Sequence, residues 1–357
     1  METASTLLTL PGALAAIMLA ALNAYVLLGG ADFGGGVWDL LATKPRREEQ
    51  RALIAHAIGP IWEANHVWLI LVVVLLFTCF PPAFATIVTE LHIPLTLMLV
   101  GVVLRGSAFT FRTYDSSADD VQRRWGLVFS WSSILTPAAL GICVGAMSAG
   151  AVGSASSNPG APFLERFVLP WTNPFVLGVG LFALVLFAFL AAVYLTVEAE
   201  GDVGLQRDFR RRALGAGMAL FLCAFGTLAL ARAYAPRILV GVTQSPAALP
   251  LQLATAVMAL LAFAALIVRR YRVARLAAGA QVSLILWGWG ISLYPFIIPD
   301  TLTIQAASAP PITLRLTLGA LALGAVVLVP SLVYLFRVFK ARPSAFASLD
   351  ESPESSH

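Results

Sequence analysis

The sequence predicts an all-α integral membrane protein with about nine transmembrane helices, arranged as two four-helix bundles and one extra helix. Hydrophobic residues make up 59% of the 357 residues, and charged residues make up only 12%. An average soluble domain carries about twice that share of charge. The 23 Lys and Arg residues also gather in short segments between apolar runs. Both observations indicate that a lipid bilayer is the solvent for most of this chain.

Nine apolar runs are long enough to cross a bilayer. A hydrocarbon core about 30 Å thick requires about 20 residues of helix. The runs are residues 7–29, 52–80, 86–107, 124–149, 173–197, 212–234, 247–268, 276–298 and 314–338.

Two loops rich in turn-forming residues divide the runs into groups. The first loop, residues 150–162, separates a first bundle (1–149) from a second bundle (163–298). A Pro-rich segment then leads into a ninth helix (314–340), and residues 341–357 form a polar tail. All of these parts would belong to one membrane domain.

The basic residues predict an orientation. Most of them follow the first, third, fifth, seventh and ninth runs, and the positive-inside rule assigns that side to the cytoplasm. The amino terminus is then outside and the carboxyl terminus inside. The net charge of +4 reflects this placement and indicates no nucleic-acid partner. Because the first basic residue is Lys44, the first run is expected to remain as a helix and not to be cleaved as a signal.

The first run ends in a glycine-rich segment that contains an acid, Asp32. Gly34 and Gly36 let a neighbouring backbone approach closely, and Gly30 and Gly34 have the spacing of tightly packed membrane helices. Asp32 is therefore expected in a tightly packed, locally unwound helix end facing the cytoplasm. The alternative is a helix cap at the membrane interface.

The second run contains a carboxylate, Glu63, in the segment Gly59–Trp68. On a continuous helix His56, Glu63 and His66 share one face, and Glu63 lies about 15 Å from the cytoplasmic start. An ionisable group in a bilayer costs roughly 2.5–3.5 kcal/mol and is usually functional. The pattern favours a proton path entered at His56. Alternatively, Glu63 is protonated and bonds a neighbouring helix, and His66 bonds a backbone carbonyl.

Arg105 stands at the inner end of the third run, on the side predicted for Asp32 and His56. We expect a carboxylate partner for it, because the alternative is for its side chain to extend to the interface. The histidines are too few and too poorly placed for haem ligation by this chain alone: His56, His66, His92 and His357. The three cysteines show no paired spacing and are expected to be packing residues.

Five motifs together resemble subunit II of the cytochrome bd-type quinol oxidases, including the cyanide-insensitive relatives. They are DFGGG (32–36), GPIWEANHVWLI (59–70), RGSAFTFR (105–112), NPF (173–175) and YPFIIP (294–299). The second motif is long and specific, and it contributes Trp62, Asn65, His66 and Trp68 as motif or packing residues beside Gly34 and Gly36. The resemblance extends over nearly the whole chain.

The resemblance implies a respiratory complex in the bacterial inner membrane that oxidises quinol and reduces dioxygen to water. The haems (b and d, or b only) and the catalytic residues belong to a partner, subunit I. This chain would support assembly and supply cytoplasmic protons through Glu63, with Asp32 and Arg105 at matching motif positions near the cytoplasmic mouth. The polar face of the second run adds His56 to this path. A small accessory single-helix subunit and a bound quinone stay open. The family often has a second acid where Gly29 stands, so no role can rest on that pair of acids here.

Two other functions remain as alternatives. A purely structural partner of subunit I would need no proton path. A secondary transporter would use an intramembrane Glu63 and a broken helix near Gly34 to bind a cation or substrate.

Overall fold

The computed structural model of the chain describes residues 9–59, 62–114, 119–153 and 160–340. Within these residues, nine helices are long and apolar enough to cross a membrane. They are α2 (Leu10–Leu40), α4 (Trp62–Cys79), α6 (His92–Tyr114), α7 (Asp119–Ser148), α11 (Pro174–Glu198), α12 (Val203–Tyr234), α14 (Ala248–Ile267), α15 (Tyr271–Leu293) and α16 (Pro311–Lys340). The predicted all-α membrane fold is therefore confirmed, and the tail from residue 341 lies outside the described residues.

Shorter elements connect the long helices. They are α3 (Arg47–Ile58), α5 (Pro81–Glu90), α9 (Phe163–Phe167), α10 (Leu169–Thr172), α13 (Pro236–Gln244), β1 (Phe296–Ile298) and β2 (Leu302–Thr303). None of these elements stands out as separate in the pattern of apolar runs. The two strands pair antiparallel in a small hairpin that follows α15.

Helix starts follow the local sequence. Thr9 caps α2 by accepting a hydrogen bond from the Gly12 amide at 3.3 Å, and Asn173 caps α11 by accepting from the Val176 amide at 3.0 Å. Asp202 caps α12 in the same way, with the Leu205 amide at 2.9 Å. Each cap satisfies a backbone N–H that has no partner inside its helix. The NPF motif thus marks the start of a membrane-spanning helix.

The second predicted run, 52–80, is not one helix. α3 ends at Ile58, and α4 begins at Trp62. The Gly59-Pro60 pair gives a physical reason, because proline removes a backbone donor and clashes with the preceding helical turn. Likewise, the third predicted run begins at residue 86, which lies in α5, and the spanning helix α6 begins at His92.

α11 lies at the centre of the packing. It contacts α2, α7 and α12, and one hydrophobic core joins residues such as Phe33 of α2 with Phe187 and Phe189 of α11. A second core nearer the hairpin joins Leu14, Phe80 and Ile298. The first predicted bundle therefore shares its core with the second, and their division into two four-helix groups stays a prediction.

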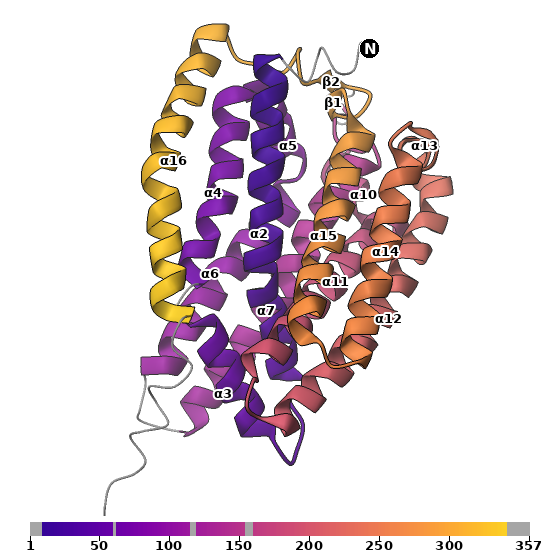
Figure 1. Cartoon of the computed structure of the whole chain (residues 1–357). Coiled ribbons are helices and arrows are strands. Elements are labelled where there is room, and N and C mark those ends of the chain that lie inside the picture. Colours follow the sequence, from indigo (N-terminus) through magenta and orange to yellow (C-terminus); the bar gives the residue numbers. More distant parts are fainter. Residues whose placement is uncertain (1–8, 60–61, 115–118, 154–159, 341–357) are drawn as a thin grey trace, which may run out of the picture.

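The connections collect at two ends of the molecule (Figure 1). α3, the α11–α12 connection, the α14–α15 connection and the end of α16 lie at one end, and the start of α2 and the hairpin lie at the other. We call the first the arginine-rich end, because Arg46, Arg47, the arginines of 207–212 and those of 269–275 belong to it. α16 packs mainly against α2 and α4 and leaves most of its surface exposed.

Candidate functional site

α2 buries Asp32 inside the helix bundle. The helix is continuous from Leu10 to Leu40, so the expected local unwinding near Gly34 is wrong. Asp32 is 6% exposed, and the adjacent Phe33 is 1% exposed. The carboxylate therefore lies within a regular helix and among packed side chains, and it does not cap a helix end at the interface.

Asn65 of α4 reaches this carboxylate. Its side-chain Nδ2 donates a hydrogen bond to Asp32 Oδ2 at 2.7 Å, and the amide itself is 2% exposed. Two residues separated by 33 positions thus meet between α2 and α4. The DFGGG and GPIWEANHVWLI motifs are brought together by this contact.

Arg105 of α6 is the third member of the buried cluster. It is 1% exposed and interacts electrostatically with Asp32. Asp32 is therefore the carboxylate partner that the sequence predicts for Arg105. Its guanidinium also lies 4.6 Å from the centre of the Phe33 ring and 5.3 Å from that of Phe129. Ring faces attract a cation and replace part of the lost hydration. Its Nε and Nη2 nevertheless donate to no group in the described part of the chain.

His66 lies beside the cluster in an aromatic cage. Its ring centre is 5.9 Å from those of Tyr25 and Trp62 and 6.0 Å from that of Phe33. Its buried Nδ1 has no hydrogen-bond partner among the described residues. The alternative in which His66 bonds a backbone carbonyl through this nitrogen is therefore not what the structure shows.

Glu63 is exposed on the surface of the chain, in the first turn of α4. The continuous helix from residue 52 on which its expected depth was calculated is wrong, so that depth stays a prediction. In the first turn, a carboxylate is favourably placed relative to the α4 dipole. The Glu63 side chain therefore points away from the helix bundle, toward the lipid or the protein that lies against α4.

His56 belongs to a different helix from Glu63. It lies exposed in the last turn of α3, so the predicted common face of His56, Glu63 and His66 does not exist. Glu63 and His66 do share α4. Of the predicted site residues, Asp32, Asn65, Arg105 and His66 lie together in the structure. His56 lies apart from them on α3.

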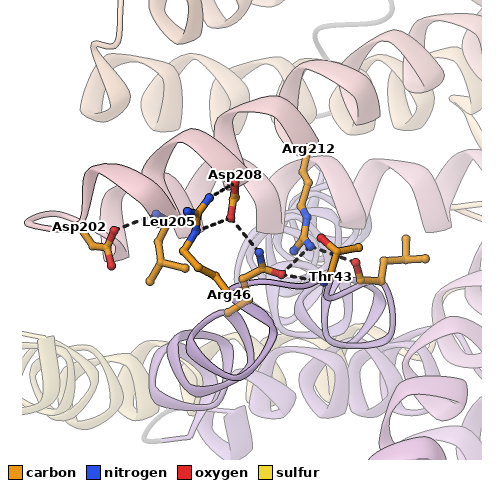
Figure 2. Close-up of polar contacts among 8 residues, drawn as sticks. Thr43, Arg46, Asp202, Leu205, Asp208 and Arg212 are labelled. Carbon is orange, nitrogen blue, oxygen red and sulfur yellow. Dashed lines mark hydrogen bonds and ion pairs between the residues drawn. The ribbon is translucent and has the colours of Figure 1, made fainter.

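A polar clamp holds α3 against α12 (Figure 2). Arg46 donates two hydrogen bonds to Asp208, at 2.9 and 2.7 Å, and Gln50 Nε2 donates to the same carboxylate at 2.8 Å. Arg212 Nη2 donates to Gln50 Oε1 at 2.8 Å and to the carbonyl of Leu41 at 3.0 Å. Hydrogen bonding to Asp208 raises the pKa of Arg46. This clamp fixes the helix that precedes Glu63.

The remaining motif residues pack near the cluster. A Cβ on Gly34 would lie 2.0 Å from the carbonyl oxygen of Phe187, and one on Gly36 would lie 2.2 Å from Ser133 Oγ. Only glycine permits α2 to approach α11 and α7 so closely. The Trp62 ring lies next to Gly106 and is tilted against the Phe109 ring, with the ring centres 6.1 Å apart. Trp68 packs against the same hydrophobic core as Phe33.

A cavity of about 310 Å³ adjoins the buried cluster. Asp32 and Asn65 line it, and Tyr194, Glu198 and Arg275 line it from α11 and α15. These last three residues are not among those that the sequence predicts for the site. The available signal was a carboxylate at the end of the fifth apolar run and an arginine just before the eighth, a pair that only the tertiary structure joins.

The described residues contain no group of three or more His, Cys, Asp or Glu side chains placed to hold a metal ion. The expectation that haem belongs to a partner subunit stays a prediction. Cys79 and Cys143 are buried, and Cys223 is half-buried; all three are free thiols.

A bundle of membrane-spanning helices around a buried acid, amide and guanidinium defines a polytopic membrane protein with an intramembrane polar site. The chain belongs to the family described as cytochrome bd terminal oxidase subunit II, whose model matches residues 10–339. The family proposed from the five motifs is thereby confirmed.

Individual relatives agree with this assignment. The chain is 33% identical to "Cytochrome bd ubiquinol oxidase subunit 2" of Bacillus subtilis over 33% of this chain and 34% of that protein. It is 22% identical to "Putative cytochrome bd menaquinol oxidase subunit II" of the same species over 88% of this chain and 91% of that protein. The first match thus spans about a third of its relative's length.

A solved structure shares the fold. It is "The structure of bd oxidase from Geobacillus thermodenitrificans", with a TM-score of 0.72 and 21% sequence identity. The match covers 93% of this chain and 99% of that chain.

Proposed function

We propose that this chain is the non-haem subunit of a quinol oxidase complex and conducts protons to its haem-bearing partner, subunit I, through Glu63. The single observation that carries the proposal is the placement of Glu63, exposed on α4, within one turn of residues that reach the buried Asp32 cluster. Membership in the subunit II family supports the partner. The complex would take electrons from quinol and reduce dioxygen to water in the bacterial inner membrane.

The exposed position of Glu63 favours a polar group of another subunit as its neighbour. A charged side chain that faces hydrocarbon is unfavourable, and the residues around Glu63 on α4 are apolar, including the exposed Val67 and Ile70. A protein partner covering α4 removes that cost if it offers a proton-accepting or hydrogen-bonding group. The face of α4 that carries Glu63 is therefore where we place the contact with subunit I.

The helical geometry of α4 supports a route from the buried cluster to that face. At about 100° per residue, His66 lies about 100° from Asn65 and about 60° from Glu63 around the helix axis. His66 therefore stands between the buried and the exposed residues of α4. A neutral imidazole accepts a proton on one nitrogen and releases one from the other, which suits a relay.

Arg105 positions the carboxylate of Asp32. Its guanidinium interacts electrostatically with Asp32 inside the bundle, so the carboxylate oxygens have a fixed place from which to receive a proton and pass it on. In this scheme Asp32 holds the transferred proton at Oδ, Asn65 orients the carboxylate, and Glu63 delivers the proton at the subunit contact. His56, exposed at the arginine-rich end, would act at most as a surface collector.

The test is Glu63→Gln in the assembled complex, with oxygen consumption and haem content measured together. Loss of a proton-transfer group reduces rate by about 10²–10⁴-fold, so we expect a large fall in turnover with haem content unchanged. Glu63→Asp keeps the carboxylic acid and should retain much of the activity. Unchanged turnover would refute the proton path. Loss of haem together with turnover would favour the purely structural role, and an active chain without a haem-bearing partner would favour a transporter.

A further inference from the structure

We propose that the cavity between α2, α11 and α15 is a water-filled inlet that carries protons from the arginine-rich end to Asp32, and that Glu198 at its mouth collects them. The inference rests on the proposed function, because it supplies the source of the proton that Asp32 passes on. The residues that it adds, Tyr194, Glu198 and Arg275, lie outside the five sequence motifs.

The two ends of the cavity have different chemistry. Its deep end is lined by Asp32 and Asn65, which are joined by a hydrogen bond. Its mouth is lined by Glu198, the last residue of α11, and by Arg275, in the second turn of α15. The side chains of Glu198 and Arg275 are 23% and 33% exposed, so the mouth reaches the surface while the deep end is buried.

The cavity is long enough to link those ends. Glu198 and Ala191 both line it from α11, and seven residues of helix correspond to about 10 Å along the axis. Its volume of about 310 Å³ has room for several water molecules, each of which needs polar partners. Asp32, Asn65, Tyr194 and Glu198 supply such partners along its length.

An ion pair stands at the mouth. Arg275 Nη1 donates to Glu198 Oε1 at 3.3 Å, and its guanidinium lies 4.8 Å from the centre of the Tyr194 ring. These contacts hold Glu198 at the opening. A proton taken from bulk water by the Glu198 carboxylate passes to the first cavity water, each water releases one proton as it accepts another, and the last proton binds Asp32. No electron moves, and each transfer conserves charge.

The chain provides a matched control two residues away. Glu200 also pairs with an arginine of α15, Arg272, at 2.9 Å, but neither residue lines the cavity. Glu198 lines the inlet and is 23% exposed, whereas Glu200 does not line it and is 63% exposed. We expect Glu198→Gln to lower oxygen turnover several-fold with the quinol KM and haem content unchanged, and Glu200→Gln to leave turnover at the parental rate.

Water access is tested without reference to turnover. Ala31 lines the cavity from α2, whereas Ala21 of the same helix is 2% exposed and does not line it. In inverted membrane vesicles carrying the whole complex, a membrane-impermeant cationic thiol reagent should modify Ala31→Cys much faster than Ala21→Cys or the parental chain. Adding Ala57→Leu, which fills the cavity from α3, should slow that reaction, and Ala52→Leu on the exposed side of α3 should not.

The outcomes separate this inference from the proposed function. If Ala31→Cys reacts no faster than Ala21→Cys, the cavity is dry or holds a lipid-like molecule. The proposal of a water-filled inlet is then wrong. If it reacts but Glu198→Gln turns over at the parental rate, Glu198 is not the collector, and the proposal is overturned. In either case a strong defect in Glu63→Gln would leave the proton path to subunit I standing. A silent Glu63→Gln refutes that path itself.

Discussion

Arg105 is the residue whose environment best explains the buried site. It is a cation held between two aromatic rings and near one carboxylate, with almost no contact with solvent. A buried charge pair often adds little net stability, but removing one partner leaves the other charge uncompensated. The effects on stability of substituting Arg105 and Asp32 should therefore be coupled.

At the residue scale, we predict that Arg105→Met destabilises the chain by about 3–5 kcal/mol, the usual cost of breaking a buried pair. The double variant Arg105→Met/Asp32→Asn should be less destabilised than the two single variants would add up to, because both charges are gone. Thermal unfolding of the purified complex measures this. Arg211→Met, at an exposed site at the arginine-rich end, is the control and should behave like the parent. Strict additivity of the single variants would contradict the coupling.

At the element scale, close helix contacts replace the hydrophobic driving force that soluble proteins use. Lipid tails are as apolar as leucine, so helices in a membrane associate through packing and polar contacts. α2 and α11 pack at Gly34, and α3 is held to α12 by the Arg46–Asp208 clamp. A substitution that breaks either contact should lower the stability of the protein.

The first such defect concerns α2 and α11. Gly34→Ala places a methyl group 2.0 Å from the backbone oxygen of Phe187, which the backbone cannot accommodate without moving a helix. We expect a loss of about 1–3 kcal/mol, as for overpacking in other cores. Gly226→Ala on α12 meets no atom within 4 Å and should be neutral. Equal thermal midpoints for the two variants would show that α2 and α11 are less tightly packed than described.

The second defect concerns the clamp. Asp208→Asn removes the negative charge to which Arg46 and Gln50 both donate hydrogen bonds, so the contact between α3 and α12 is weakened. A lower thermal midpoint and faster proteolysis near α3 are expected. Asp202→Asn is the matched control, because asparagine caps α12 about as well as aspartate. A clamp variant as protease-resistant as this control would argue against the clamp.

At the scale of the whole molecule, α3 and the α11–α12 and α14–α15 connections lie at one end, and the hairpin lies at the other (Figure 1). Most of the described basic residues of the connections belong to the first end. Arg237 forms an ion pair with Asp300 at the hairpin end and packs over Phe296 at 4.2 Å. These contacts tie β1 and β2 to α13. Nine spanning helices within the described residues would place the start of α2 and the end of α16 on opposite sides of the membrane.

The corresponding prediction is a topology. A fluorescent protein fused after residue 357 should fluoresce in the cytoplasm, and an alkaline phosphatase inserted in the α15–α16 connection should be active outside. The physical reason is the retention of Lys and Arg on the cytoplasmic side during insertion. Phosphatase activity at the carboxyl terminus would invert the orientation and remove the arginine-rich end from the cytoplasm.

Local sequence predicted some parts of the site and missed others. Asp32, Glu63 and Arg105 stood out because charged residues are rare in apolar runs. His56 was misplaced because a helical wheel assumes continuity through Gly59-Pro60. Glu198 and Arg275 were missed because each sits at a helix end, where charged residues are ordinary.

The sequence by itself determined the solvent, the spanning helices and the family, because these depend on run length, composition and local motifs. Only the tertiary structure decided which polar groups meet. Asn65 and Asp32, or Glu198 and Arg275, come from distant segments, and their contacts depend on how close α2, α4, α11 and α15 approach. Such approaches are set by glycine and aromatic packing over many residues at once, which no local pattern records.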